Sequence, residues 1–379
     1  MPLSDYLNSS KVLGSEYIIE NLDQIDSPAL VVYPELIRYN VKLALSMLNS
    51  EGGTVLRPHI KTVKTPQVAT ILLRHGIDRF KCSTIAEGEM LAMVEAPDVL
   101  LAYQPTELKI ERLGLLIGKY PGTHFSCLVD NVRTAEWLSQ KFINKPLDVF
   151  IDLNVGMNRT GVTPANAEHL VTKIKDLKGI RIKGLHAYDG HIRAMDTVQR
   201  QKETDDSYLQ ASQLRDSLKA KYGLDLDLVI GGTPSFPMHS ERAGVQCSPG
   251  TFVFWDAGYG NSFTDMKFKW AAILITRIIS IIDEHTICLD LGSKAVAPDP
   301  ALPRVVFPEH PEGEVVSQSE EHLVVKVPDS DVYKVGDVWM GVPIHVCPTV
   351  NLYEQIHVVE RQRWMDNWTV LARKRMISI

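Results

Sequence analysis

The feature that most constrains this chain is a regular alternation of short apolar runs and longer amphipathic stretches over residues 27–250. The apolar runs are rich in β-branched residues, which is typical of buried strands. The stretches between them, such as 34–50 and 134–143, place leucine and isoleucine three and four positions apart, which is typical of helices. We predict strands at eight runs: 29–33, 54–60, 79–85, 98–104, 124–130, 147–155, 182–188 and 226–232. Strands alternating with helices indicate a parallel sheet.

Eight such units over about 210 residues fit a (β/α)8 TIM-type barrel, which we assign to residues 27–250. An open, doubly wound sheet is the alternative, but it usually has fewer units. Its glycine-rich dinucleotide fingerprint also does not follow the first predicted strand. We therefore favour the barrel.

The alternation stops near residue 250, and the remaining chain has a different pattern. Strand-like runs follow one another there, separated by proline, glycine and acidic turns: 268–282, 285–292, 320–328 and 337–360. This pattern predicts a second, mostly β C-terminal domain over residues 251–379. Whether residues 1–26 pack on that domain stays open at this point.

The composition excludes several classes of protein. Of the 379 residues 45% are hydrophobic and 23% charged, as in globular proteins, and the net charge of -6 argues against nucleic acid as a partner. No apolar run approaches the roughly 20 residues that span a membrane, and the first residues lack the pattern of a signal peptide. Five widely spaced cysteines do not suggest a disulfide framework. We expect a cytoplasmic globular protein.

One basic cluster, "RPHIKTVK" at residues 57–64, lies where the second predicted strand ends. It contains Arg57, His59, Lys61 and Lys64. A lysine at a strand end is usually a solvated surface group. In a barrel, however, catalytic groups lie at the carboxyl ends of the strands, and a desolvated lysine with cationic neighbours becomes a nucleophile that forms Schiff bases.

Other reactive or glycine-rich groups follow later predicted strands. Arg159 lies in "NVGMNRTG", His186 and Tyr188 end the seventh run, and "GGTP" follows the eighth. Barrels usually bind phosphate after strands seven and eight, where glycine lets backbone N–H groups approach an anion. "GGTP" alone is compatible with an ordinary turn. A strand-end lysine together with a phosphate site suggests pyridoxal phosphate, which acts as an electron sink.

Seven motifs, in order along the chain, carry a more specific resemblance: "PHIKT", "VGMNRTGV", "AYDGH", "GGTP", "PGTFVFWDAGYG", "DLGSKA" and "HVCPTVNL". Together they resemble the D-threonine aldolase and D-serine dehydratase family of alanine-racemase-like, fold-type III pyridoxal-phosphate enzymes. The resemblance runs from about residue 25 almost to the end of the chain. It implies a cofactor-binding barrel and a β domain that binds a divalent metal.

The resemblance also implies roles for individual residues. Lys61 should hold the cofactor as a Schiff base and exchange protons at the substrate Cα. Arg159 should lie near the phenolic oxygen of the cofactor, Tyr188 near its ring, and His59 should help to shape the site. The residues implied to bind the phosphate are Gly231, Gly232, Thr233, Gly250 and Thr251.

His345 and Cys347 are the metal-binding candidates. They lie two residues apart in a strand-like run, so we expect their side chains on one face of a strand. In the family that the chain resembles, aldolases tend to carry aspartate at the second position and use manganese or magnesium, whereas dehydratases tend to carry cysteine and use zinc. Cys347 therefore favours zinc, with manganese or magnesium as alternatives.

The same argument favours one reaction over another. We expect a dehydratase of the D-serine or D-3-hydroxyaspartate type, which gives a 2-oxo acid and ammonia. The alternative is a D-threonine aldolase, which gives glycine and an aldehyde. A racemase or a non-catalytic cofactor-binding barrel would leave the metal pair unexplained. The expected partner is a small D-amino acid, with no nucleic acid or membrane, and the resemblance implies a homodimer. The sequence does not predict which β-substituent is accepted.

Overall fold

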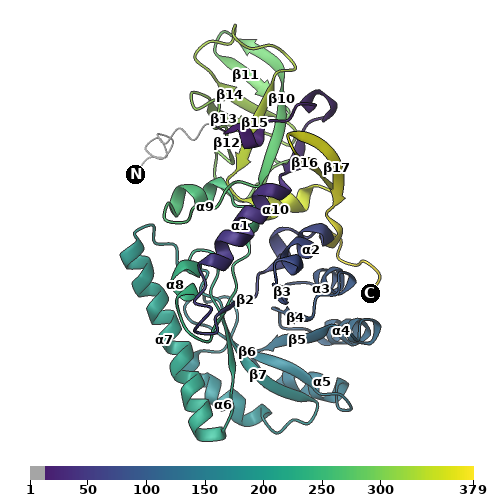
Figure 1. Ribbon diagram of the computed structural model, residues 1–379, viewed down its shortest axis with the longest axis vertical. Helices are drawn as coiled ribbons and strands as arrows, with labels where there is room; N and C mark the ends of the chain where they lie inside the picture. Colours follow the sequence, from purple (N-terminus) through teal and green to yellow (C-terminus); the bar gives the residue numbers. More distant parts are fainter. Residues whose placement is uncertain (1–12) are drawn as a thin grey trace. The chain divides into compact units, whose positions relative to one another are not determined.

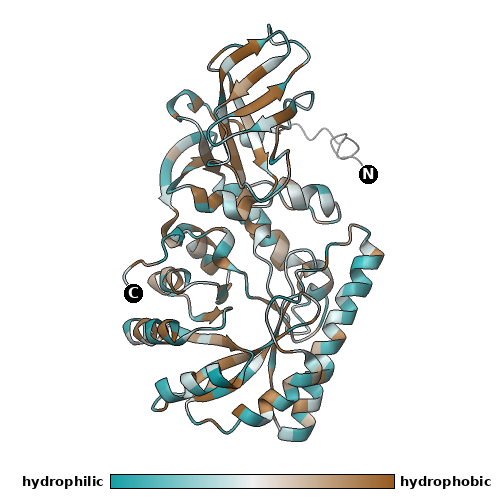
Figure 2. Ribbon diagram, turned by 180° about the vertical axis from the view of Figure 1, so that it is seen from behind, coloured by the Kyte–Doolittle hydropathy of each residue, from teal (hydrophilic) through white to brown (hydrophobic). Residues whose placement is uncertain are grey.

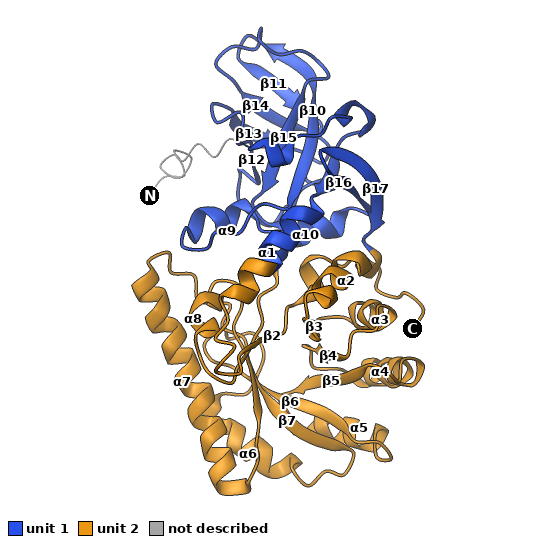
Figure 3. Cartoon of the chain, in the orientation of Figure 1, with its two compact units in different colours: residues 1–41, 251–370 blue, residues 42–250, 371–379 orange. Residues whose placement is uncertain are grey.

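The computed structural model describes residues 13–379, and the chain forms two compact units (Figure 3). The barrel unit contains residues 42–250 and 371–379, and the β unit contains residues up to 41 and 251–370. Each unit is therefore built from two separate segments of the chain. Helix α1 (Pro34–Ser46) begins in the β unit and ends in the barrel unit.

The barrel unit is built around an eight-stranded parallel sheet in the order β2-β9-β8-β7-β6-β5-β4-β3 (Figure 1). A further parallel bridge between His59 and Lys81 joins the two ends of this order and closes the barrel. The strands are β2 (Val55–Leu56), β3 (Arg79–Cys82), β4 (Asp98–Leu101), β5 (His124–Val129), β6 (Leu147–Leu153), β7 (Ile180–Ala187), β8 (Asp227–Ile230) and β9 (Gln246–Cys247). The predicted barrel class is confirmed.

Helices follow the strands and surround them, as Figure 1 shows. They are α2 (Pro66–Arg74), α3 (Ile85–Met93), α4 (Glu107–Lys119), α5 (Val132–Lys141), α6 (Pro164–Ile174), α7 (Thr197–Tyr222) and α8 (Phe236–Ser240). Three begin at side-chain caps: the side chain of Thr84 accepts from the backbone N–H of Glu87, that of Asn131 from Thr134, and that of Asp196 from Gln199. No helix within residues 13–379 combines the length and apolar character needed to cross a bilayer.

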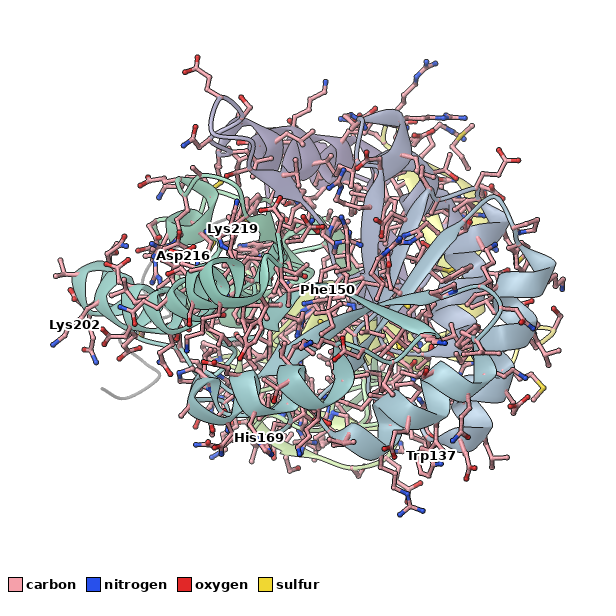
Figure 4. The ribbon with its side chains drawn as sticks, turned by 90° about the horizontal axis from the view of Figure 1, so that it is seen from below. Trp137, Phe150, His169, Lys202, Asp216 and Lys219 are labelled. Atoms are coloured by element: carbon pink, nitrogen blue, oxygen red, sulfur yellow. The ribbon has the colours of Figure 1, made fainter. Side chains whose placement is uncertain are left out.

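Apolar side chains fill the interior of the barrel. Leu100, Leu128, Phe150 and Val229 come from four different strands and form one buried cluster. Figure 4 shows Phe150 inside the ring of strands and Lys202 at the outer side of α7. Figure 2 shows the same division by hydropathy, with apolar strands and a largely polar α7. The interior is thus a packed core below the strand ends, which is usual for this fold.

The prediction that residues 29–33 form the first barrel strand is wrong. Strand β1 (Ala29–Val32) pairs antiparallel with β10 and parallel with β16 in the β unit. All four of its residues are buried. A fully buried strand has the same continuous apolar sequence in the barrel sheet and in the sheet of the β unit. The eighth barrel strand is instead β9, whose two residues are too few to show a pattern. "GGTP" consequently follows the seventh barrel strand and residues 249–251 follow the eighth.

The β unit is a nine-stranded sheet with the main order β13-β14-β11-β10-β1-β16-β17, and β15 pairs with both β10 and β12. Its remaining strands are β10 (Ala272–Asp283), β11 (Thr286–Leu289), β12 (Val305–Val306), β13 (Glu314–Gln318), β14 (Leu323–Lys326), β15 (Val338–Pro343), β16 (Gln355–Glu360) and β17 (Arg363–Thr369). Within residues 13–379 it also contains α9 (Ala257–Ser262), α10 (Val346–Leu352) and the 3-10 turns η2 (Ser15–Tyr17), η3 (Leu22–Gln24) and η5 (Thr251–Val253).

The open question about residues 1–26 has an answer for the described part. The backbone N–H of Glu20 donates to Gln362 O at 2.8 Å, and Arg363 forms an ion pair with Glu20 at 2.9 Å. Residues 13–26 therefore pack on the β unit. Residues 1–12 lie outside the described part of the chain.

The last nine residues belong to the barrel unit and contact α3. The 3-10 turn η6 (Leu371–Arg373) starts this tail. The carboxylate of Glu89, whose side chain is buried, accepts hydrogen bonds from the backbone N–H groups of Ser378 at 3.1 Å and Ile379 at 3.3 Å. The tail is thus held by α3 and is not a separate C-terminal part of the β domain, as the predicted range 251–379 implied.

A charged network lies at the amino ends of β4, β5 and β6. His124 contacts Asp148 at 3.0 Å and Asp98 at 3.7 Å. Asp98 also pairs with Arg57 at 2.6 Å, and Asp148 with Arg181 at 2.6 Å. Hydrogen bonds to Asp148 and Asp98 raise the pKa of His124 to about 9. Burial alone would raise the pKa of Asp148, but its hydrogen bonds with His124 and Arg181 lower it to about 2.

We expect the stabilisation from His124 to depend on pH in a defined window. Its pKa in the folded protein lies above the ordinary value of 6.5, so its contribution is complete below about pH 6.5 and is lost as pH rises through about 9. His124→Gln should therefore lower the free energy of unfolding by about 1 kcal/mol at pH 6, and by almost nothing at pH 10. Urea unfolding of both proteins at the two pH values measures this. A difference that stays the same at both would contradict the ion pairs.

Candidate active site

The basic cluster at residues 57–64 does not act as one group, because its members have different partners. Arg57 is fully buried and donates to Gln246 Oε1 at 2.6 Å and to Phe80 O at 3.2 Å, besides its ion pair with Asp98. It thereby ties β2 to β9, β3 and β4. Its role is structural.

Lys64 is also held away from solvent by specific partners. Its Nζ pairs with the buried carboxylate of Glu87 at 2.9 Å. Its backbone carbonyl accepts from the N–H of Ala372 in the tail at 3.1 Å, and its own φ of 52° is left-handed. Lys64 therefore anchors the loop that follows Lys61.

Lys61 lies in the 3-10 turn η4 (Ile60–Thr62), directly after the β2 region. Its Nζ is 6.0 Å from the centre of the Tyr188 ring. Its backbone N–H donates to Nδ1 of His59 at 3.3 Å. Burial is the main reason why the pKa of His59 lies well below its ordinary value, and the charges of Lys61 and Lys81 lower this pKa further. The neutral imidazole can therefore accept this hydrogen bond.

Tyr188, directly after β7, is the centre of the predicted site. The guanidinium carbon of Arg159 lies 4.8 Å from the centre of its ring. A Cβ at Gly232 would come within 3.1 Å of the ring, so the "GGTP" turn also lies against Tyr188. The structure thus brings together Lys61, Arg159, Tyr188 and Gly232, each of which was predicted to end or follow a barrel strand.

The two predicted phosphate segments also meet within the barrel unit. The N–H of Gly250 donates to Oγ1 of Thr233 at 3.2 Å. Gly231 has a φ of +84°, which favours glycine, and a Cβ at Gly250 would come within 2.9 Å of His59 O. Backbone therefore approaches closely after the seventh and eighth barrel strands, where such folds bind phosphate. Thr251, the next residue, belongs to the β unit.

Sequence reasoning missed Lys81, which faces the same tyrosine. On β3, Cys82 lies against Gly88 of α3, so its neighbour Lys81 points to the opposite side, the barrel interior. Its Nζ is 5.7 Å from the centre of the Tyr188 ring and 3.3 Å from Nε2 of His186. The sequence does not single it out, because β3 also carries the basic Arg79 among its four residues.

This site has the basic side chains that a phosphorylated aromatic cofactor requires. Three basic side chains, Lys61, Lys81 and Arg159, lie within 6.0 Å of the centre of one tyrosine ring. Within residues 13–379 none of the three forms an ion pair with a carboxylate. Unpaired cations beside a glycine-lined turn favour an anionic ligand. The residues present therefore fit pyridoxal phosphate.

The predicted metal pair lies in the β unit, but the predicted strand geometry is wrong. Strand β15 ends at Pro343; His345 is the N-cap of α10, and Cys347 lies in the first turn of that helix. Proline at 348 and the buried apolar residues of α10 favour the helical turn. Nδ1 of His345 contacts Asp299 Oδ2 at 2.7 Å.

These contacts fit a metal site with open positions. His345 hydrogen-bonds with Asp299 through Nδ1 and also with Cys347, and a carboxylate on one ring nitrogen is the usual arrangement around a metal-bound histidine. Sγ of Cys347 lies 3.7 Å from Oγ1 of Thr251. The described residues contain no cluster of three or more metal-binding side chains. The pair would therefore supply two protein ligands to a bound metal and leave the other positions to water or substrate.

The "WDAGYG" motif supports the segment that carries this pair. Oδ1 of Asp256 accepts from the N–H of Tyr259 at 2.9 Å, and Oδ2 accepts from the N–H of Val346 at 3.1 Å. Asp256 thus caps both α9 and the start of α10. A Cβ at Gly258 would lie 2.4 Å from Ile344 O, so this position requires glycine. The motif fixes the backbone on either side of His345.

Two family models match the chain. The model described as "Alanine racemase, N-terminal domain" matches residues 33–254, and the model described as "Putative serine dehydratase domain" matches residues 271–359. Among curated proteins, the chain is similar to a D-threonine aldolase of Arthrobacter sp, with 26% identity over 93% of this chain and 94% of the relative. It is also similar to the D-serine dehydratase of Dictyostelium discoideum, with 22% identity over 92% of this chain and 97% of the relative.

Solved structures of other proteins share the fold of this chain. The crystal structure of D-threonine aldolase from Filomicrobium marinum superimposes with a TM-score of 0.84 and 25% sequence identity, covering 92% of this chain and 96% of that one. An alanine racemase of Clostridium difficile 630 superimposes with a TM-score of 0.69 at 14% identity, over 92% of this chain and all of the other. The barrel and the β domain are both part of this likeness.

Proposed function

Since the chain belongs to the family described as "Alanine racemase, N-terminal domain", whose model matches more than half of it, we propose that it is a pyridoxal-phosphate-dependent lyase. The proposed substrates are D-β-hydroxy-α-amino acids. The observation that carries the proposal is the convergence of Lys61, Arg159 and the "GGTP" turn on Tyr188. Relatives that span nearly the whole chain are lyases of this kind, which supports the proposal.

Each residue of the barrel site then has a task. When bound, pyridoxal phosphate supplies an electron sink for the pair released at the substrate Cα. Lys61 would hold the cofactor and would move the proton at the substrate Cα. Tyr188 would lie against the cofactor ring, and Arg159 would supply positive charge for its phenolic oxygen. The phosphate is assigned to the turns at 231–233 and 250–251.

Within this class, we favour dehydration to a 2-oxo acid and ammonia. Cys347 supports this choice, because an imidazole and a thiolate together favour zinc over manganese or magnesium. Zinc held by His345 and Cys347 would polarise the β-hydroxyl of the substrate as a Lewis acid, so that it leaves more easily. The second candidate is aldol cleavage, which the similarity to two D-threonine aldolases favours.

Product analysis distinguishes the two reactions. Purified protein with pyridoxal phosphate and zinc or manganese is incubated with D-serine, D-threonine and D-3-hydroxyaspartate, with the L-enantiomers as controls. We expect ammonia with pyruvate from D-serine or oxaloacetate from D-3-hydroxyaspartate. Glycine with acetaldehyde or glyoxylate would show that aldol cleavage is the reaction instead. Cofactor binding without turnover of any of the three D-amino acids would contradict both.

A further inference from the structure

Lys81 is a buried amine that the proposed reaction does not use. Its residue exposure is only 2%, and its Nζ faces the Tyr188 ring that also faces Lys61 and Arg159. An amine in this position affects any group that binds against the ring. Its state of protonation therefore matters for the site.

A chain of buried hydrogen bonds fixes the side chain of Lys81. Nζ contacts Nε2 of His186 at 3.3 Å, and Nδ1 of His186 contacts Oδ1 of Asp152 at 2.7 Å. Oδ2 of Asp152 accepts from Thr160 at 2.9 Å and from Gln104 at 2.6 Å. Burial opposes ionisation of Asp152, but these hydrogen bonds lower its pKa.

The direction of the hydrogen bonds follows from these charges. An ionised Asp152 only accepts, so Nδ1 of His186 donates to it, and the lone pair of Nε2 faces Lys81. Burial is the main cause that lowers the pKa of His186, and the charge of Lys81 is the second. The imidazole therefore stays neutral. Lys81 is therefore the donor toward His186 and keeps further hydrogen atoms for another acceptor.

The charges around Lys81 work in opposite directions. Lys61 and Arg159 repel its ammonium form, whereas Asp152 and Asp189 attract it, and neutral His59 and His186 complete its surroundings. Burial is the largest effect, and with the charge of Lys61 it lowers the pKa of Lys81 to about 7. An anion bound nearby would reverse this balance, because it stabilises the ammonium form.

We propose that Lys81 is a further cofactor-binding residue of the barrel site, positioned by His186 and Asp152, and that it takes up one proton when the anionic cofactor binds. This inference rests on the proposed function, because it takes pyridoxal phosphate as the ligand. The proton comes from solvent and forms a third N–H bond at Nζ of Lys81. No electrons are transferred, and the new ammonium offsets one negative charge of the ligand.

Isothermal titration calorimetry of the cofactor-free protein with pyridoxal phosphate measures this proton directly. Titration at pH 8 in two buffers of different ionisation enthalpy gives the number of protons taken up. At that pH a group with a pKa of about 7 is about nine-tenths unprotonated, so we expect an uptake approaching one proton at Lys81. At pH 6 this contribution should almost vanish, because Lys81 is already protonated.

Three variants separate the role of Lys81 from other effects. Lys81→Met should lose the pH-dependent uptake and bind the cofactor about ten-fold more weakly, since a charge-assisted contact is missing. Lys81→Arg, which is always charged, should bind more tightly than Lys81→Met but also without uptake. Lys202→Met is the matched control: it removes an exposed lysine of α7 and should behave like wild type.

The possible outcomes separate this inference from the proposed function. If wild type does not bind pyridoxal phosphate, the proposed function fails. If wild type binds it and Lys81→Met shows the same proton uptake and affinity, the proposed function stands and the role of Lys81 is refuted. Should Lys81→Met not fold, Lys81→Arg decides: uptake equal to that of wild type would overturn the proposal.

Discussion

Replacement of Lys61 by alanine is expected to abolish the covalent attachment of pyridoxal phosphate and to lower kcat by about 10³-fold or more. The reason is that one amine carries both tasks, holding the cofactor and moving the proton at Cα. Wild-type protein should show the visible absorbance of a lysine-linked cofactor. The Lys61→Ala protein should show only that of free pyridoxal phosphate.

Borohydride reduction and peptide mapping identify the amine that holds the cofactor. Lys64 is the matched control, because it lies three residues away and pairs with Glu87. Lys64→Met should keep the absorbance. Lys81 faces the same ring as Lys61, so the map has to distinguish these two lysines. A label on Lys64, Lys81 or the exposed Lys294 would show that the assignment of Lys61 is wrong.

The second large effect concerns the metal. Cys347→Asp is expected to keep the fold and the cofactor but to move the metal preference from zinc toward manganese or magnesium, because a carboxylate is a harder ligand than a thiolate. Dehydration should fall by about 10²-fold or more, since the new ion polarises the β-hydroxyl less. Aldol cleavage, which needs only the alkoxide, should suffer less.

This prediction is tested by chelating wild type and variant and refilling each with zinc, manganese or magnesium. Bound metal is measured by elemental analysis, and both sets of products are assayed. Asp299→Asn is a useful control, because Asp299 contacts Nδ1 of His345 and so orients this candidate ligand. The substitution should weaken zinc binding by about ten-fold but leave the preferred metal unchanged. Wild type that is equally active before and after chelation would refute the metal site. An unchanged metal preference in Cys347→Asp would remove Cys347 as a ligand and the argument for dehydration.

The sequence predicted the class of fold but not the membership of each sheet. The periodicity of apolar residues counts buried runs, and eight runs led to the correct barrel. It cannot say which sheet a run joins, because β1 is buried on both sides just as a barrel strand is. Its partners, β10 and β16, lie more than two hundred residues away in the chain. The two-residue strand β9 carries no periodicity at all.

The candidate site was also predicted only in part. The position of Lys61, Arg159 and Tyr188 at or after the ends of predicted barrel strands, with the family resemblance, was sufficient to expect them together, and the structure places them together. Lys81 was missed because nothing in its local pattern reveals what it faces across the barrel. The structural roles of Arg57 and Lys64 were equally invisible, since their partners Asp98 and Glu87 are distant in sequence.

The assembly of each unit from two chain segments has a consequence for synthesis on the ribosome. Strand β1 is made early but lies between β10 and β16, so its apolar residues wait for about 240 residues until their first partner emerges. The barrel strands are complete by residue 247, yet Lys64 and Glu89 receive their partners Ala372 and Ser378 only with the final residues. Neither unit can therefore finish folding before the other has been translated. A nascent chain stalled before residue 272 should expose β1 and the α3 surface together, and both are natural sites for a chaperone.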